Sequence, residues 1–186
     1  MEQMLKGSGF LMLVSFVDEV LGQGAKGDIL AQLSEEARLF YGSSMEVGAW
    51  HPLRLFDEME RAILNGYFKG QVSYARKIGR YTMERAARDM YRLAFISFKK
   101  PRDALDNINR LWELYNRPGR VVMATGKKPC TAKGTLEDTF EISDLHMEHL
   151  AGWAEAMMEH CGAQGVSVEW AREKGKPVFK FTWEEE

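Results

Sequence analysis

The spacing of the apolar residues changes near Pro118, and this change limits the folds open to the chain. Before it, apolar side chains recur three and four positions apart, as in Leu105, Ile108 and Leu111, which is typical of one helix face. After it, apolar and polar residues alternate, which predicts half-buried antiparallel strands. We therefore expect an α+β chain of one domain, with a helical part over residues 1–117 and a sheet over residues 118–186.

Glycine and proline divide the first part into helices, because glycine ends helices and proline is tolerated in their first turn. Short helical turns are expected after Asp28 and Ser34, and Thr82 is a candidate N-cap for one of the longer helices. The longer helices are expected over Phe10–Leu21, Pro52–Asn65, Val72–Ile78, Thr82–Phe98 and Pro101–Tyr115.

The second part predicts two strand pairs separated by one helix. The segments RVVMAT (120–125) and TLEDTFEIS (135–143) form the first pair, and Ser143 caps a helix that ends near Cys161. In the last hairpin, Val168 and Trp170 share one face with Val166, and Phe179, Phe181 and Trp183 share one face of the other strand. Such aromatic and β-branched pairs stabilise sheets. We expect the helix to lie on this aromatic face of a four-stranded antiparallel sheet.

Composition gives the chain no obvious class of partner. The formal charge is −2 over 186 residues, and no segment resembles a nucleic-acid-reading motif, so we expect no nucleic acid. The apolar run Phe10–Val17 is followed directly by Asp18 and Glu19, and it is far shorter than a membrane span. Two cysteines, Cys130 and Cys161, suit a reduced cytoplasmic protein.

The order of features resembles a myxobacterial-type paralogous family of uncharacterised domains. That family is similar to vinyl-four-reductase domains and, more remotely, to haem nitric-oxide-binding domains and small transport-particle subunits. The resemblance covers about Gly9 to Trp183 and implies a fold that borders an apolar cavity and often self-associates. The segments that carry it are AWHP (49–52), LWELY (111–115), AGW (151–153) and GVSVE (165–169).

The chain departs from these families where a metal or haem would be held. The related domains carry C-x-x-x-G-x-x-x-C at the last turn, whereas this chain has Ala171 and Phe179 at those positions. No Tyr-x-Ser-x-Arg segment is present for haem propionates. His146 and His149 are one helical turn apart, but His160 lies about 16 Å further along the axis. We therefore expect partly exposed histidines, no metal and no cofactor.

Residues 69–102 form a basic segment, with ten bases and two acids in an otherwise near-neutral chain. Arg85, Arg88 and Arg92 fall on one face of the helix expected to start at Thr82. Guanidinium groups in such a row suit an anion or an acidic protein partner. The alternative is a solvated helix face, in which Arg85 and Arg88 each pair with an acid four residues away.

Catalysis is not indicated. The chain has no nucleophile paired with a base, no phosphate-binding glycine loop and no C-x-x-C motif. The acids Asp57, Glu58 and Glu60 are expected on the solvent face of an amphipathic helix.

Large and adaptable apolar side chains instead allow either a plain core or a ligand pocket. We expect a sensory or adaptor domain that binds a small apolar or amphipathic ligand; the alternative is a ligand-free interaction module that forms a homodimer. The candidate pocket residues are Phe56, Met59, Met83, Met90, Tyr91, Phe95, Trp112 and Tyr115.

Overall fold

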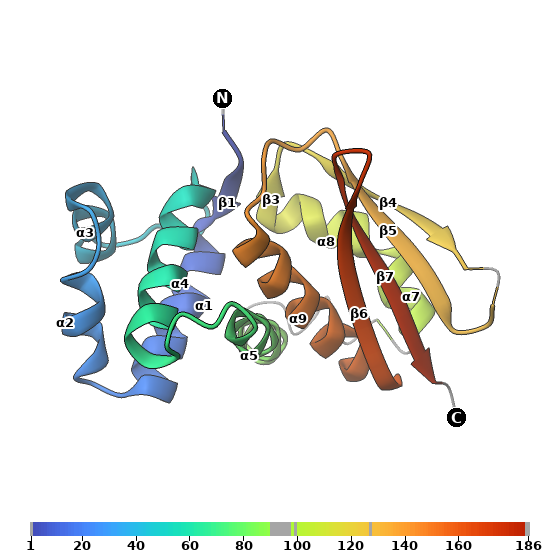
Figure 1. Ribbon diagram of the computed structural model, residues 1–186, viewed down its shortest axis with the longest axis horizontal. Coiled ribbons are helices and arrows are strands. Elements are labelled where there is room, and N and C mark those ends of the chain that lie inside the picture. The colour runs from blue at the N-terminus through green and yellow to red at the C-terminus, as the bar shows by residue number, and fades with distance from the viewer. Residues whose placement is uncertain (1, 90–97, 99, 127, 185–186) are drawn as a thin grey trace.

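A helical part is followed by a four-stranded antiparallel sheet, and helix α9 joins the two hairpins of that sheet (Figure 1). The structure is a computed structural model and describes residues 2–89, 98, 100–126 and 128–184. Within this part of the chain, the α+β class and the order strand-strand-helix-strand-strand expected for the second part are confirmed. Among the described helices, none combines the length and apolar composition that crossing a membrane requires.

The helical part contains both long helices and short turns. Helix α1 continues into a π-helical turn, η1, and the helix expected from Pro101 is divided at Asn107 into α7 and α8. Pro52 precedes its helix rather than starting it. The bounds are Gly7–Phe16 for α1, Val17–Leu21 for η1, Ala25–Leu30 for α2, Glu35–Gly42 for α3, Leu53–Tyr67 for α4, Tyr74–Arg88 for α5, Pro101–Asp106 for α7 and Ile108–Tyr115 for α8.

Helix α5 corrects one expectation. The sequence divides this region at Gly79 into two helices with Thr82 as a cap, but α5 continues across that boundary from Tyr74 to Arg88. Most of the rest of the second expected helix, residues 90–97, lies outside the described residues. Thr82 lies inside the helix, where its hydroxyl donates to the carbonyl of Gly79 at 2.9 Å. Gly79 marks a close approach of α9 rather than a helix end, because a Cβ there would lie 2.0 Å from the carbonyl oxygen of His149.

The sheet has the order β4-β5-β7-β6, with all neighbours antiparallel. Its strands are Arg120–Thr125 (β4), Thr131–Glu137 (β5), Gln164–Glu173 (β6) and Lys176–Glu184 (β7). The expected facing of the last hairpin is confirmed, since Val168 pairs with Phe181 and Trp170 with Phe179. Strand β5 begins and ends earlier than the expected strand over 135–143. It ends at Glu137 because Asp138 has a positive φ of 57° and turns the chain.

A second, smaller sheet was not expected from the sequence. Strand β1 (Met4–Lys6) lies between β2 (Trp50–Pro52) and β3 (Asn116–Arg117). These strands are two or three residues long, too short for a periodic pattern to reveal. They hold the start of the chain against the end of α8.

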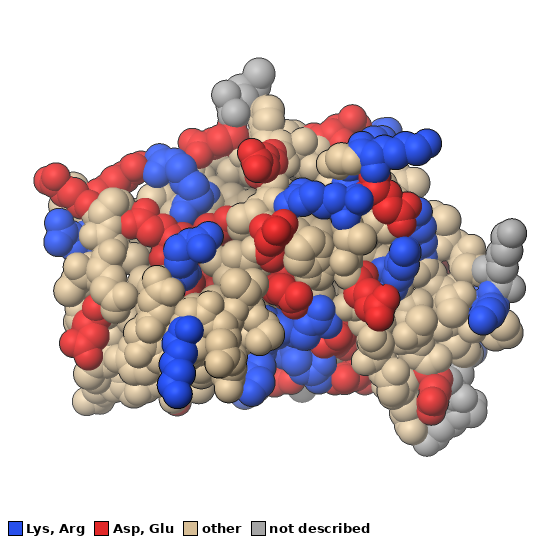
Figure 2. Space-filling model, in the orientation of Figure 1, with Lys and Arg blue, Asp and Glu red and all other residues tan. Residues whose placement is uncertain are grey.

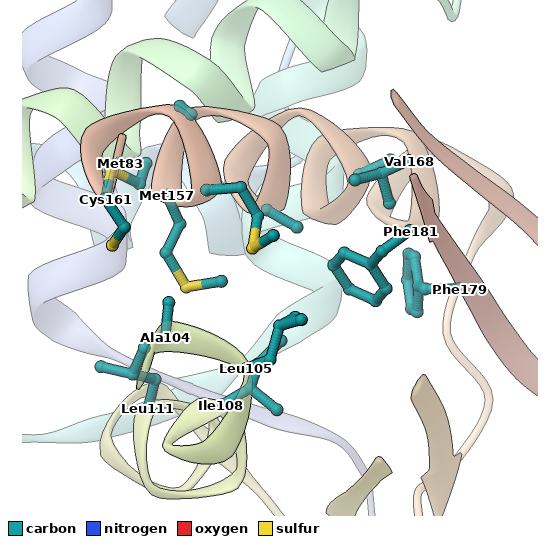
Figure 3. Packing of buried hydrophobic residues seen from close by; sticks show 14 of the residues in the cluster. Met83, Ala104, Leu105, Ile108, Leu111, Met157, Cys161, Val168, Phe179 and Phe181 are labelled. Carbon is teal, nitrogen blue, oxygen red and sulfur yellow. The ribbon is translucent and has the colours of Figure 1, made fainter. Parts of the chain in front are cut away.

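Helix α9 (Asp144–His160) lies between α5 and the sheet, and its N-cap Ser143 accepts from the backbone N–H of His146 as expected (Figure 1). On the sheet side, Met157 of α9 points toward Ala104 of α7, while Phe179 and Phe181 approach from β7 (Figure 3). A second buried cluster joins α1 to α5 on the other side. The functional candidates lie where these two clusters meet.

Candidate functional site

An apolar cavity of about 100 Å³ lies between the helical part and the sheet. Helices α1, α4, α5, α8 and α9 line it together with strands β1, β3, β4, β5 and β7. Of the eight residues expected to form a pocket, Phe56, Trp112 and Tyr115 line the cavity. Met59 and Met83 are fully buried, but they are not among the residues that line it. The remaining three, Met90, Tyr91 and Phe95, lie outside the described residues, so the pocket assignment stays a prediction.

Polar atoms interrupt the apolar lining of the cavity. Within the described chain, the buried side-chain atoms of lining residues without a hydrogen-bond partner include Trp112 Nε1, Asn116 Oδ1 and both ring nitrogens of His146. A buried polar group without a partner costs about 1–3 kcal/mol, so such groups in a folded protein require an explanation. The indole N–H is a donor, the amide oxygen is an acceptor, and the imidazole nitrogen can be either.

A buried hydrogen-bonded chain crosses from α4 to α5 through His149. Its Nδ1 lies 2.7 Å from Glu60 Oε1, and its Nε2 lies 3.1 Å from the Thr82 hydroxyl. Burial raises the pKa of Glu60 well above its usual value and lowers the pKa of His149 to about 4. Both shifts favour the neutral forms, so the Glu60 carboxyl donates to His149. Nε2–H then donates to Thr82, whose own hydrogen is directed at the carbonyl of Gly79.

His146 is the second buried imidazole of α9. Its ring stacks on that of His149, with centroids 5.5 Å apart, and Phe56 meets both rings edge-on. Its Nδ1 lies 3.5 Å from Asp57 Oδ1, and burial lowers its pKa. The other oxygen of Asp57 accepts a hydrogen bond of 2.6 Å from Ser143, the N-cap of α9.

These contacts correct two expectations. His146 and His149 are 2% and 5% exposed, not partly exposed, and both line the cavity. Glu60 is completely buried and Asp57 nearly so, whereas both were expected in solvent. The signal that was available is that α4 and α9 each carry polar residues three positions apart, acids on one helix and imidazoles on the other.

The basic segment is partly explained by packing of α5 against α9. Arg76 donates to Glu148 at 2.9 Å, to Glu155 at 2.5 Å and to the carbonyl of Val168 at 2.9 Å. Arg80 contacts Glu155 and Glu159 on the same helix. Guanidinium groups form such multiple bonds with carboxylates because their donors are fixed in one plane. Part of the positive charge in the segment is therefore neutralised within the protein.

The expected anion-binding residues also have acidic neighbours. Arg85 contacts Glu19 and Asp89, each at 2.7 Å, and Arg88 contacts Asp89 at 3.5 Å. Arg92 lies outside the described residues. On the face shown in Figure 2, bases and acids are interspersed. Binding of an anion or an acidic partner by Arg85, Arg88 and Arg92 stays a prediction, as does the homodimer.

Comparison with known proteins identifies the fold. No protein-family model matches the chain, and no curated protein sequence matches it. Solved structures do match over nearly the whole length. The Fe(II) unliganded H-NOX (haem nitric oxide/oxygen binding) protein from K. algicida has 14% identity and a TM-score of 0.73, with 97% of each chain covered.

Two further structures agree with this match. An oxygen-binding H-NOX domain related to soluble guanylate cyclases, in complex with oxygen, has 9% identity and a TM-score of 0.68, with 97% of this chain and 95% of that chain covered. A mutant of T. tengcongensis H-NOX has 10% identity and a TM-score of 0.67, with 97% of this chain and 98% of that chain covered. The remote resemblance to haem nitric-oxide-binding domains is therefore confirmed at the level of fold. The links to the other families stay predictions.

Proposed function

We propose that the chain is a non-catalytic sensor or adaptor domain that binds a small apolar or amphipathic ligand in the cavity. The observation that carries the proposal is the combination of an apolar lining with unpartnered polar atoms on Trp112, Asn116 and His146. Ligand sites have this composition, with a few polar groups that fix orientation in a mostly apolar space. The fold supports a sensor role, because an oxygen-binding domain related to soluble guanylate cyclases shares it.

The volume of the cavity limits the ligand. About 100 Å³ is below the roughly 300–1,000 Å³ of pockets for drug-sized molecules. It is of the same order as an engineered apolar cavity of about 150 Å³ that takes up benzene. We therefore expect a diatomic or other small molecule, or one ring with a single polar group. Such a ligand can satisfy one or two of the unpartnered atoms of the lining.

Haem is the group that the fold implies, and the described residues do not fit it. The space is several times too small for a porphyrin. Neither Lys nor Arg is among the described residues that line the cavity, so two propionates would have no cation there. Both nitrogens of His149 are occupied by Glu60 and Thr82. The expected ligand is therefore smaller than a porphyrin.

Native mass spectrometry of the freshly purified chain, with an organic extract measured alongside, tests the proposal. A stoichiometric mass released on denaturation would identify the ligand and its class. Calorimetric titration with phenol and toluene, as one-ring probes with and without a hydroxyl group, then measures the cavity itself. We expect saturable 1:1 binding, with phenol bound more tightly because its hydroxyl meets the polar atoms.

Two variants show whether the probes enter this cavity. Ala154→Leu adds three carbons to a lining residue of α9 and should abolish binding. Trp112→Phe removes the unpartnered indole N–H together with part of the ring, and should weaken the binding of phenol relative to toluene up to about tenfold. Trp170→Phe is the matched control, because that indole donates to Glu148 outside the cavity. A clean native spectrum together with no saturable probe binding would contradict the proposal.

A further inference from the structure

Three side chains bring atoms that could bind a metal ion close together between α4 and α9, beside the cavity. One donor atom from each of Asp57, Glu60 and His146 lies within 4.8 Å of the other two. Among the described residues, Asp57 Oδ1, Glu60 Oε2 and His146 Nδ1 have no hydrogen-bond partner. One oxygen of the Asp57 carboxylate and one oxygen of the Glu60 carboxyl group are therefore buried without a hydrogen-bond partner, which is costly unless a cation joins them.

The neighbouring side chains hold these atoms in place. Ser143 fixes one oxygen of Asp57 at 2.6 Å, and His149 fixes one oxygen of Glu60 at 2.7 Å. Each carboxylate thus keeps its second oxygen for the common centre. Partners that orient a ligand through its other polar atom are typical of metal sites in proteins, and they raise the precision of the site.

We propose that Asp57, Glu60 and His146 form a binding site for one divalent transition-metal ion, a site that the sequence did not predict. Two carboxylates and one imidazole are the donor types that Zn²⁺ and similar ions accept, and an imidazole donor disfavours Mg²⁺ and Ca²⁺. The charge also balances once the ion displaces the proton that Glu60 carries in the metal-free protein, since a 2+ ion and two carboxylates sum to zero in a buried place.

The distances are compatible with this assignment. With metal–ligand bonds of about 2.0–2.1 Å, tetrahedral ligand atoms lie about 3.3 Å apart. His146 Nδ1 and Asp57 Oδ1 are already 3.5 Å apart. The remaining separations exceed the ideal value by at most about 1.5 Å, which small side-chain rotations close. Three protein ligands would leave a fourth position for water or another small ligand.

A path for the ion is present at the surface. Asp57 also lines a surface pocket of about 440 Å³, together with Glu2, Glu141 and Arg54. The side chain of Asp57 is 16% exposed, whereas those of His146 and Glu60 are 2% and 0% exposed. Of the three site residues, Asp57 is therefore the one that reaches solvent, beside the carboxylate of Glu141, whereas Glu2 is paired with Arg54 at 3.2 Å.

Titration of the metal-free full chain with Zn²⁺ by calorimetry, and with Co²⁺ by visible absorption, tests the site. Both titrations are done in a Cys130→Ser, Cys161→Ser background, which removes thiolate ligands. We expect one equivalent of metal to bind, and the melting temperature to rise with metal concentration. The d–d bands of Co²⁺ should report oxygen and nitrogen ligands.

Three variants and one control locate the bound ion. Asp57→Asn and Glu60→Gln keep the side-chain shapes, and His146→Gln replaces the imidazole by a neutral amide. Each should weaken binding by more than about 100-fold, because replacing an outer-shell partner alone costs about 10–100-fold. His160→Gln, at the far end of the same helix, should leave the affinity unchanged. Melting curves without metal verify that each variant folds; the two carboxylate variants suffice if His146→Gln does not fold. Absence of saturable binding, or binding that survives in the carboxylate variants, would overturn the proposal.

Discussion

Replacing Gly79 by alanine tests whether the contact between α5 and α9 is as close as the structure indicates. A Cβ at this position would lie 2.0 Å from the carbonyl oxygen of His149 and 3.0 Å from the backbone nitrogen of Trp153. Gly152 on α9 is the counterpart, since its Cβ would lie 1.9 Å from the carbonyl oxygen of Arg76. The obstacles are backbone atoms, which cannot turn aside as a side chain can.

The magnitude follows from two opposing effects. The helices must separate by at least about 1 Å, and overpacking of this kind costs about 3 kcal/mol or more when the neighbours cannot yield. The separation also strains the hydrogen bond of 3.1 Å between Thr82 and His149, which contributes about 1 kcal/mol. Alanine returns about 1 kcal/mol through its higher helix propensity. We expect a net loss of about 3 kcal/mol in the free energy of unfolding.

Thermal and urea unfolding measure this loss, and Gly27→Ala is the matched control. Gly27 lies in α2, where a Cβ would meet nothing within 4 Å. There alanine should stabilise by about 0.5–1 kcal/mol. In melting temperature, Gly79→Ala should fall by about 6–12 °C and Gly27→Ala should rise by about 1–4 °C. A Gly79→Ala protein as stable as the unsubstituted chain would refute the close crossing, and with it the placement of His149 beside Thr82.

Two further predictions concern other buried groups. Arg76→Gln leaves two α9 carboxylates without their main partner, so unfolding in urea should show a loss of about 2 kcal/mol. Arg54→Gln breaks two exposed pairs, with Glu2 and Glu36, and should cost less than about 1 kcal/mol; equal effects of the two variants would contradict the packing role of Arg76. Burial raises the pKa of Cys161 to about 11, whereas Cys130 is partly exposed. Iodoacetamide at pH 8 should therefore modify Cys130 in the native protein and Cys161 only after unfolding. Peptide mass spectrometry measures the modification of each cysteine.

The last hairpin of the sheet could be predicted from the sequence in detail, because a strand pattern of period two also fixes which residues face each other. Val168, Trp170, Phe179 and Phe181 were assigned to the correct faces, and the register pairs them as expected. The errors lie at the ends of elements. Strand β5 ends at Glu137 because of the backbone turn at Asp138, a conformation that the pattern of apolar residues does not encode.

Helix α5 shows why helix boundaries were harder to predict. Glycine at position 79 has two explanations in a sequence, a helix end or a close approach of another backbone, and only the neighbouring element distinguishes them. The basic charge of the same region was equally ambiguous. Arg76 and Arg80 bind acids of α9, so part of the charge excess belongs to the packing of two helices rather than to an external partner.

The buried polar cluster was missed for a related reason. Taken alone, α4 places Asp57 and Glu60 on a polar stripe, and a polar stripe on one amphipathic helix normally faces solvent. The pairing becomes visible only when α9 is considered with it, because acids three positions apart on one helix complement imidazoles three positions apart on the other. Each pair alone predicts exposure. Together they predict a shared buried site, since every imidazole there has a carboxylate to meet it and the charges need not reach water.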